Sequence, residues 1–483
     1  MREVKGFING EFVTSGEFGE IYSPVTGELV CNYHRTSVEQ VDQAVKAARA
    51  ALKGPWGTMS AQQRVDILYK IADGINARFD EFLAAECLDT GKPYSLASHI
   101  DIPRGAANFK VFADTIKNIA DEAFHTPTPD GTGALNYTIR KPKGVIGVIG
   151  PWNLPLLLMT WKVGPALACG DTVVVKPSEE TQLTASLLGE VMNDAGVPKG
   201  VYNVILGKGS QIGEALITNP GLDAITFTGS TETGERIAAA ASVGVRDSSL
   251  ELGGKNAGIV FADCDMDKAI EGSLRSAFAN CGQVCLGTER LYVERSIFDE
   301  FVKRMKAGAE ALKMGRSEDP ETNMGPLISK SHREKVLSYY KAAVDEGATV
   351  VTGGGIPNMP EDLANGYWIE PTIWTGLPET ASVVQEEIFG PCVHICPFDT
   401  EQEAIELAND SPYGLASAIW TENMSRGHRV AAQMETGICW VNSWFLRDLR
   451  TPFGGSKQSG TGREGGHYSL EFYSELTNIC VKL

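Results

Sequence analysis

The sequence predicts an α/β protein built around mostly parallel sheets in two successive blocks. Short β-branched runs alternate with helical stretches from Gly144 onward, and a similar alternation continues from about Leu250 to Asn442. Alternation of this kind is typical of βαβ units. A chain of 483 residues is also too long for one compact core, which favours at least two domains.

The first block combines helical and β-branched patterns. Val41, Val45 and Ala48 recur at helical spacing, and the same spacing continues further along. It predicts helices over 38–53, 61–89, 184–195, 210–218 and 231–241. Strands are predicted over 144–150, 172–176, 202–206 and 224–228.

The second block has the same alternation. Its predicted strands are 259–261, 290–293, 349–352 and 416–420, and its predicted helices are 266–280, 297–312 and 331–346. The tail 472–483 is rich in β-forming residues. We expect this tail to form a strand that pairs with another chain.

Charge and cysteine usage restrict the class of protein. The formal net charge of −18 argues against nucleic acid or an anionic membrane as a partner. The ten cysteines are scattered, and the first residues lack an apolar signal core, which indicates free thiols in a reducing cytoplasm. No metal site is expected, because no CxxC occurs with a matching His. Glycine and proline interrupt the apolar stretch 144–161, so it predicts a strand entering a loop and no membrane helix.

Two glycine-containing turns follow predicted strands. The run 207–213 resembles a dinucleotide fingerprint, with one residue too many between Gly209 and Gly213. A tight strand-to-helix turn explains it equally well. In the run 227–234, Ser230 follows Gly229 and is placed to cap a helix, whose N–H groups would face an anion.

Two further runs place polar side chains where a ligand of an open α/β sheet would bind. Lys176 and Glu179 follow a strand, and either contacts ribose hydroxyls or forms a solvated strand end. Asn153 lies between two prolines in apolar company. Its amide is either satisfied within the protein or directed at a ligand, where it would be a good donor to an oxyanion.

Cys285 and Glu251 each lie among small residues. A thiol and a carboxyl are the groups needed to form and then hydrolyse a thioester. A cysteine taken alone is more often inert and buried. Gly282 and Gly287 would permit a ligand to approach Cys285 closely, so the pair predicts an active site if the two side chains meet in space.

At these residues the chain resembles the aldehyde dehydrogenase superfamily over nearly its whole length. Within it the sequence is similar to the 2-hydroxymuconic semialdehyde dehydrogenases, in residues 87–92, 99–109 and 444–452. The motifs that carry the superfamily resemblance are residues 7–10, 151–153, 176–179, 227–230, 251–255, 282–285, 387–391 and 452–455.

The resemblance implies an architecture. A Rossmann-type NAD-binding domain would comprise residues 1–121 and 141–249, and a catalytic domain residues 250–445. A small β element for oligomerisation would comprise 122–140 and 467–483. The late loop 446–466 would return to the cofactor domain and line the substrate tunnel. A homodimer or homotetramer is implied.

The resemblance also implies roles for individual residues. Cys285 would be the nucleophile and Glu251 the general base. The amide of Asn153 and the backbone N–H of Cys285 would form the oxyanion hole. NAD would be held by Trp152, Lys176, Glu179, Gly209, Gly229, Ser230, Gly253, Glu387 and Phe389.

The implied reaction is NAD-dependent oxidation of 2-hydroxymuconic semialdehyde to the dicarboxylic acid. Arg104 and Arg447 are placed to bind the remote carboxylate of this small anionic substrate, with Arg450 as a third candidate. Surface arginines paired with Asp101 or Asp448 are the alternative. Other open readings are oxidation of 2-aminomuconic semialdehyde or another small aldehyde, a CoA-acylating dehydrogenase, which needs no hydrolytic base, and a non-catalytic protein on the same fold.

Overall fold

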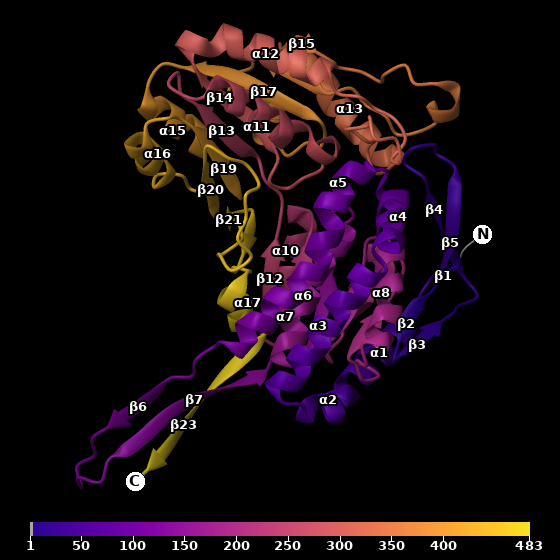
Figure 1. Cartoon of the computed structure of the whole chain (residues 1–483), viewed down its shortest axis with the longest axis vertical. Helices are drawn as coiled ribbons and strands as arrows, with labels where there is room; N and C mark the ends of the chain where they lie inside the picture. The colour runs from indigo at the N-terminus through magenta and orange to yellow at the C-terminus, as the bar shows by residue number, and fades with distance from the viewer. Residues whose placement is uncertain (1–2) are drawn as a thin grey trace.

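The computed structural model describes residues 3–483 and confirms the predicted α/β fold. It contains one eight-stranded and one seven-stranded sheet, each covered by helices, and three small sheets. Figure 1 shows the helices of the eight-stranded sheet below the seven-stranded block, with a long β arm projecting away from both.

The eight-stranded sheet is parallel at its centre and antiparallel at its edges. Its order is β22-β12-β11-β8-β9-β10-β2-β3, and the five strands from β12 to β10 are parallel. Its strands are β2 (Gly6–Ile8), β3 (Glu11–Val13), β8 (Val145–Ile149), β9 (Thr172–Lys176), β10 (Tyr202–Val204), β11 (Ala224–Thr228), β12 (Asp247–Glu251) and β22 (Gly460–Thr461).

Helices cover both faces of this sheet, because alternate residues of each strand point to opposite sides. Ile146 and Val148 join one hydrophobic cluster, and Val145 and Ile149 join another. The first cluster includes α3 (Ala61–Ala77), α4 (Phe79–Thr90), α6 (Asp101–Lys117), α7 (Pro155–Cys169) and α8 (Leu183–Asp194). The second includes α1 (Val38–Ala51), α9 (Glu214–Ile217) and α10 (Thr231–Ser242).

The seven-stranded sheet has the order β15-β16-β17-β14-β13-β19-β20, with only β15 antiparallel. Helices pack on both faces here too. Its strands are β13 (Asn256–Val260), β14 (Thr288–Glu294), β15 (Thr349–Thr352), β16 (Thr372–Thr375), β17 (Cys392–Phe398), β19 (Ala416–Trp420) and β20 (Ile438–Val441). Its helices are α11 (Met266–Phe278), α12 (Phe298–Glu310), α13 (Lys330–Asp345), α14 (Ser382–Gln385), α15 (Glu401–Asn409) and α16 (Met424–Ala431).

The small sheets and short helices join these blocks. One sheet combines β1 (Glu3–Val4), β4 (Phe18–Tyr22) and β5 (Leu29–His34), and another combines β18 (Tyr413–Gly414) and β21 (Ser456–Lys457). The arm consists of β6 (Ala123–Thr126), β7 (Ala134–Pro142) and β23 (Ser474–Lys482). The short helices are α2 (Pro55–Thr58), α5 (Tyr94–His99) and α17 (Gly466–Phe472).

The tail forms the predicted strand, and one of its edges pairs within the chain. All nine residues of β23 pair with β7 of the same chain. The other edge of β23 has no strand partner within residues 3–483. The pairing of this free edge with another chain stays a prediction.

Two predicted helices are interrupted. The stretch 61–89 divides into α3 and α4 at Arg78, whose backbone leaves the helical region (φ −110°, ψ 28°). Arg78 also binds Glu190, with 2.6 Å between Nη2 and Oε2. The stretch 210–218 opens with a wide π-helical turn over Gly209–Gly213. This wider turn accommodates the extra residue between the two glycines of the fingerprint.

Two further features concern the whole chain. Within residues 3–483 no helix combines the length and apolarity needed to cross a membrane. All ten cysteines are free. The limits of the predicted domains stay a prediction.

Candidate active site

The carboxyl ends of four parallel strands meet at one edge of the eight-stranded sheet. The segment leading to Asn153 follows β8, Lys176 ends β9, Gly229 follows β11 and Glu251 ends β12. Backbone hydrogen bonds of 3.0 Å join Gly229 N to Glu251 O and Gly150 N to Lys176 O. Ligands of open α/β sheets bind at this edge.

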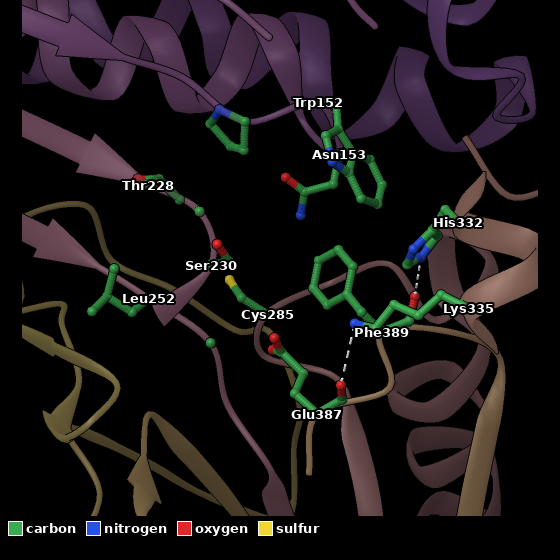
Figure 2. Close-up of a pocket in the computed structure, with 13 residues that line it drawn as sticks. Trp152, Asn153, Thr228, Ser230, Leu252, Cys285, His332, Lys335, Glu387 and Phe389 are labelled. Atoms are coloured by element: carbon green, nitrogen blue, oxygen red, sulfur yellow. Dashed lines mark hydrogen bonds between the residues drawn. The ribbon is translucent and has the colours of Figure 1, made fainter. Parts of the chain in front are cut away.

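An open pocket of about 170 Å³ lies at this edge and faces a segment that precedes β17 (Figure 2). Many of the predicted site residues line it, from the oxyanion and nucleophile candidates to the cofactor candidates. These are Trp152, Asn153, Gly229, Ser230, Gly253, Cys285, Glu387 and Phe389; Pro151, Thr228, Leu252, His332 and Lys335 complete the lining.

The loop before Cys285 has an unusual backbone. Asn280, Cys281 and Gly282 are consecutive residues with φ of 52°, 56° and 70°. Left-handed conformations are uncommon for residues other than glycine. At Gly282 a Cβ atom would lie 2.0 Å from the carbonyl oxygen of Gly390, so only glycine fits. This turn directs the chain into the pocket at Cys285.

Gln283 ties this loop to the oxyanion candidate. Its Oε1 accepts from Ile328 N at 2.9 Å, and its Nε2 donates to Asn280 O at 3.0 Å. Its backbone oxygen accepts from Asn153 Nδ2 at 3.0 Å. An amide NH₂ group has two hydrogens, so Asn153 retains a second donor for a ligand.

The surroundings of Cys285 favour its neutral thiol form. Burial, together with the carboxyls of Glu251 and Glu387, raises the pKa of this thiol to about 12. Arg447 opposes this shift. The charge of Glu251 thus acts on this thiol, and the joint action of the two side chains stays a prediction. The attacking thiolate forms only after the thiol has lost its proton.

Glu251 is a buried carboxyl poised near neutral pH. Burial raises its pKa to about 8, Glu464 adds to the shift, and Lys162 and Arg447 oppose it. Glu464 is itself paired with Lys162, with 2.7 Å between Oε1 and Nζ. Oε1 of Glu251 has no hydrogen-bond partner among the described residues. A carboxyl of this kind can accept a proton at the working pH of an enzyme.

Three predicted cofactor residues lie beside the main pocket. Glu179 lines an adjoining hollow that shares Trp152 with it, and its Oε2 accepts from Gly209 N at 3.0 Å. Lys176 Nζ donates to Pro177 O at 3.1 Å, and burial lowers its pKa to about 8. Gly209 is not needed for steric reasons, because a Cβ there would meet no atom within 4 Å.

The remaining cofactor candidates form a cradle that fits a dinucleotide. At Gly229 a Cβ would lie 2.3 Å from the Phe227 ring, so no larger residue fits. Ser230 caps α10, with its side chain accepting from Thr233 N at 3.4 Å, which leaves a helix N-terminus at the pocket. The Thr228 hydroxyl lacks a hydrogen-bond partner among the described residues, so it is available to bind a ligand.

Glu387 and Phe389 close the other side of the pocket (Figure 2). Glu387 Oε1 accepts from Gly254 N at 2.8 Å, and burial raises its pKa to about 7. Phe389 has a φ of 62° and its N–H donates to Glu289 Oε1 at 2.9 Å. The carboxyl of Glu289 therefore holds the left-handed backbone of Phe389 in place.

Sequence reasoning missed His332 and Lys335, which also line the pocket. His332 Nε2 donates to Phe389 O at 2.8 Å, and its ring lies 5.2 Å from that of Trp152. Both residues belong to α13, whose sequence is that of an ordinary charged surface helix. No local signal distinguishes them.

Arg104 and Arg447 lie beyond the pocket lining as a pair of unpartnered guanidinium groups. Among the described residues, neither forms an ion pair or a side-chain hydrogen bond. Burial lowers the pKa of each to about 10, and Arg104 contributes to the shift at Arg447. The Arg447 guanidinium lies over the rings of Trp161 and Phe453, at 5.1 and 3.9 Å from their centroids.

The third candidate arginine and the alternative partners are placed elsewhere. Arg450 is exposed and pairs with Asp448, with 2.6 Å between Nη2 and Oδ2. Asp101 pairs with Lys92 and not with an arginine. Arg450 therefore forms the surface ion pair that was the alternative to carboxylate binding. Arg104 and Arg447 form no such pair among the described residues.

A doubly wound sheet that presents a thiol, an amide and a carboxyl beside a nucleotide-type cradle is the arrangement of a cofactor-dependent enzyme acting through a cysteine. The model of the aldehyde dehydrogenase family matches residues 12–479. The chain belongs to the aldehyde dehydrogenase family, as its motifs predicted.

Individual relatives agree with this assignment. The chain is 71% identical, over 100% of both chains, to a 2-hydroxymuconic semialdehyde dehydrogenase of Pseudomonas sp. (strain CF600). It is 53% identical to a 2-aminomuconic 6-semialdehyde dehydrogenase of Pseudomonas sp., covering 100% of this chain and 99% of the relative. The NAD+ complex structure of aldehyde dehydrogenase from Bacillus cereus superposes with a TM-score of 0.96 at 39% identity, covering 100% and 97% of the two chains.

Proposed function

We propose that this enzyme uses NAD to oxidise 2-hydroxymuconic semialdehyde to the dicarboxylic acid. The relative with 71% identity carries that activity in its name. The observation that carries the proposal is the pair of half-buried arginines, Arg104 and Arg447, which form no ion pair among the described residues and whose enclosed Nε and Nη2 atoms, respectively, have no hydrogen-bond partner there. An enclosed donor without an acceptor is costly, so a ligand carboxylate is the group that would complete this site.

The charge of the whole chain makes this local site necessary. The net charge of −18 repels an anionic substrate. Arg104 and Arg447 would reverse the field where the remote carboxylate of the semialdehyde binds. The guanidinium fork binds a carboxylate through two parallel hydrogen bonds, which also orients the substrate.

The chemistry would begin when the Cys285 thiol loses its proton to water in the open pocket and the resulting thiolate attacks the aldehyde carbon. The oxygen that gains negative charge would accept hydrogen bonds from the Asn153 side-chain amide and from the backbone N–H of Cys285. Such donors stabilise the transition state more than the ground state. Gln283 keeps the Asn153 amide oriented, because its backbone oxygen already engages one of the two amide hydrogens.

NAD, when bound, would accept the hydride whose loss turns the thiohemiacetal on Cys285 into a thioester. Lys176, Glu179 and Gly209 would hold its adenosine end. Glu387 would hold the nicotinamide ribose, with Phe389 beside the ring. The other residues of the cradle are Trp152, Gly229, Ser230 and Gly253.

Glu251 would complete the turnover as a general base. With a pKa raised to about 8, its carboxyl can take a proton from water and release it again near neutral pH. The hydroxide so formed would attack the thioester carbon and displace the Cys285 thiolate, which releases the carboxylic acid. A hydrolytic base at this position favours an acid product over a CoA thioester.

We further propose a cytoplasmic homodimer or homotetramer that assembles through the β arm. The free edge of β23 supports assembly, because an unpaired strand edge is a template for pairing. Ten free cysteines support a reducing compartment. The division into a cofactor domain, a catalytic domain and an arm belongs to the same proposal.

The carboxylate assignment is tested at Arg104, because Arg447 also acts electrostatically on Cys285 and Glu251. We expect Arg104→Met to lower kcat/KM for 2-hydroxymuconic semialdehyde by about 100-fold, the value of a charged hydrogen-bond pair. The activity on hexanal, which lacks the carboxylate, should change by less than about threefold. Steady-state NADH formation measures both.

Arg450→Met is the matched control, since Arg450 lies in the same part of the chain but pairs with Asp448 at the surface. It should leave both activities unchanged. Equal losses on the two aldehydes in Arg104→Met would remove the carboxylate assignment. A higher kcat/KM of the wild-type enzyme for 2-aminomuconic semialdehyde would transfer the proposal to that substrate, which carries the same carboxylate.

A further inference from the structure

Three ionisable side chains are enclosed behind the active site. Glu86 belongs to α4, Lys92 lies between α4 and α5, and Asp101 begins α6. All three side chains are 0% exposed. Lys92 Nζ lies 2.8 Å from Asp101 Oδ2 and 3.7 Å from Glu86 Oε1. Burying three such groups is costly, and a hydrophobic cluster of similar volume is often as stable.

The cluster keeps its central positive charge. Burial opposes the charge on Lys92, but Asp101 and Glu86 together outweigh burial and raise its pKa. Burial raises the pKa of Glu86 to about 8 and also raises that of Asp101. At neutral pH Lys92 is therefore an ammonium group with three hydrogens to donate.

One of those hydrogens reaches the active-site loop. Lys92 Nζ donates to the backbone oxygen of Asn153 at 2.9 Å. The same oxygen accepts from Nδ2 of Asn280 at 3.1 Å. Asn280 belongs to the left-handed turn before Cys285. Glu86 Oε2 also accepts from Leu156 N at 3.3 Å, in the first turn of α7. The cluster thus holds the peptide that carries the proposed oxyanion donor.

Lys92 also donates to Asp101, which belongs to the same helix as the proposed carboxylate-binding residue Arg104. Arg104 lies three positions after Asp101 in α6, so the two residues share a face of that helix. The same helix is pressed against α7, because a Cβ at Gly105 would lie 2.7 Å from Leu156 Cγ. One ammonium group therefore joins the helix that carries Arg104 to the peptide of Asn153.

We propose that Lys92 is a positioning residue that sets the separation between the carboxylate-binding Arg104 and the oxyanion donor Asn153. This inference rests on the proposed function, since it assigns the length selectivity of that same site. A semialdehyde must place its carboxylate at Arg104 and its aldehyde carbon at Cys285 simultaneously. A fixed separation selects chains of one length and aligns their carbonyl with Asn153.

A double-mutant cycle tests this role. With 2-hydroxymuconic semialdehyde, we expect Lys92→Met to slow the single-turnover burst of NADH by about 10- to 100-fold, the effect of a misplaced donor. The preference for this substrate over hexanal should fall by at least about tenfold, while the Kd of NAD stays unchanged. In an Asn153→Ala background, Lys92→Met should cost less than about threefold, because the donor it positions is already gone.

Controls separate positioning from loss of folding. The control is Asp171→Asn, which changes another buried acid, just before β9 in the eight-stranded sheet. Asp171 Oδ1 accepts from Gly144 N, at the end of β8 remote from the active site. This variant should lower Tm without lowering the burst rate. If Lys92→Met does not fold, the double variant Lys92→Met/Asp101→Asn takes its place in the double-mutant cycle, because it removes the charge of Lys92 together with that of its partner Asp101. Equal factors for Lys92→Met in both backgrounds, or an unchanged preference over hexanal, would overturn the inference. A wild-type enzyme inactive on the semialdehyde would instead overturn the proposed function.

Discussion

At the scale of single residues, Cys285 and Glu251 influence each other through their charges. Burial, with ionised Glu251 adding to its effect, raises the pKa of Cys285 to about 12. Burial also raises the pKa of Glu251 to about 8, so this carboxyl is mostly neutral at pH 7 and charged above pH 8. Ionised Glu251 thus disfavours the thiolate in the free enzyme, although the same carboxylate is needed to activate water.

This gives a prediction for thiol reactivity. Glu251→Gln should alkylate at Cys285 as fast as wild type at pH 7, where Glu251 is uncharged. At pH 9 to 10 the variant should react about 10-fold faster, because it lacks the carboxylate that raises the pKa of the thiol. Iodoacetamide labelling followed by mass spectrometry measures both rates. A slower variant at pH 9 would show that Glu251 removes the proton from the thiol.

At the scale of elements, the left-handed turn over 280–282 determines where the nucleophile lies. Two of its residues are not glycine, and each such conformation costs about 1 kcal/mol or more. Surrounding hydrogen bonds compensate for this strain: Asn280 Nδ2 donates to Asn153 O at 3.1 Å and to Gln283 O at 3.2 Å. The turn therefore depends on the same peptide that Lys92 holds.

Gly282→Ala should disable this turn. The new Cβ would lie 2.0 Å from Gly390 O at a φ of 70°, so the loop must move. We expect a loss of activity of at least about 100-fold, because a 1 Å displacement of reacting groups has effects of that size. Gly150→Ala is the matched control, since a Cβ there meets no atom within 4 Å. A crystal structure of an active Gly282→Ala enzyme with an unmoved Cys285 would contradict the argument.

Elements buried on both faces could be predicted from the sequence, and strained turns could not. The β-branched runs 172–176 and 224–228 coincide with β9 and β11, because continuous apolar residues suit a central parallel strand. Nothing in Asn280 and Cys281 indicates left-handed backbone, since that conformation is imposed by tertiary hydrogen bonds. The break at Arg78 was likewise invisible, because the apolar spacing continues through it.

At the scale of the whole molecule, buried carboxyls make stability depend on pH. Burial raises the pKa of Glu86 and Glu251 to about 8 and that of Glu387 to about 7, from an ordinary value of 4.5. The folded state therefore binds extra protons between pH 4.5 and 8, and this stabilisation is lost as pH rises. Burial lowers the pKa of His332 and His394 to about 4, an opposite effect that is complete above pH 6.5.

The free energy of unfolding should consequently fall between pH 6.5 and 8. Glu251→Gln should flatten this slope by about 1 kcal/mol per pH unit, because glutamine has no proton to lose. Urea unfolding at several pH values measures the slope in wild type and variant. A stability that rises over this interval would contradict the assignment of protonated buried carboxyls.

The assembly of the site across the molecule limited what the sequence could reveal. Asn153, Glu251 and Cys285 carry local signals, because small residues or prolines surround them. His332 carries none, since a histidine on a charged helix is usually a surface residue. Lys92 lies in the run 87–92 that carries the resemblance, but nothing in that run shows that its side chain is buried. Their roles arise only when α4, α7 and α13 are brought to one edge of a sheet.

The arm and the eight-stranded sheet each contain a strand from a much later part of the chain. β7 pairs with β23, and β12 pairs with β22, although more than two hundred residues separate the members of each pair. A ribosome releases β22 and β23 more than two hundred residues after their partners. During synthesis β7 therefore pairs only with β6, and its second edge stays open to unwanted pairing until β23 has emerged.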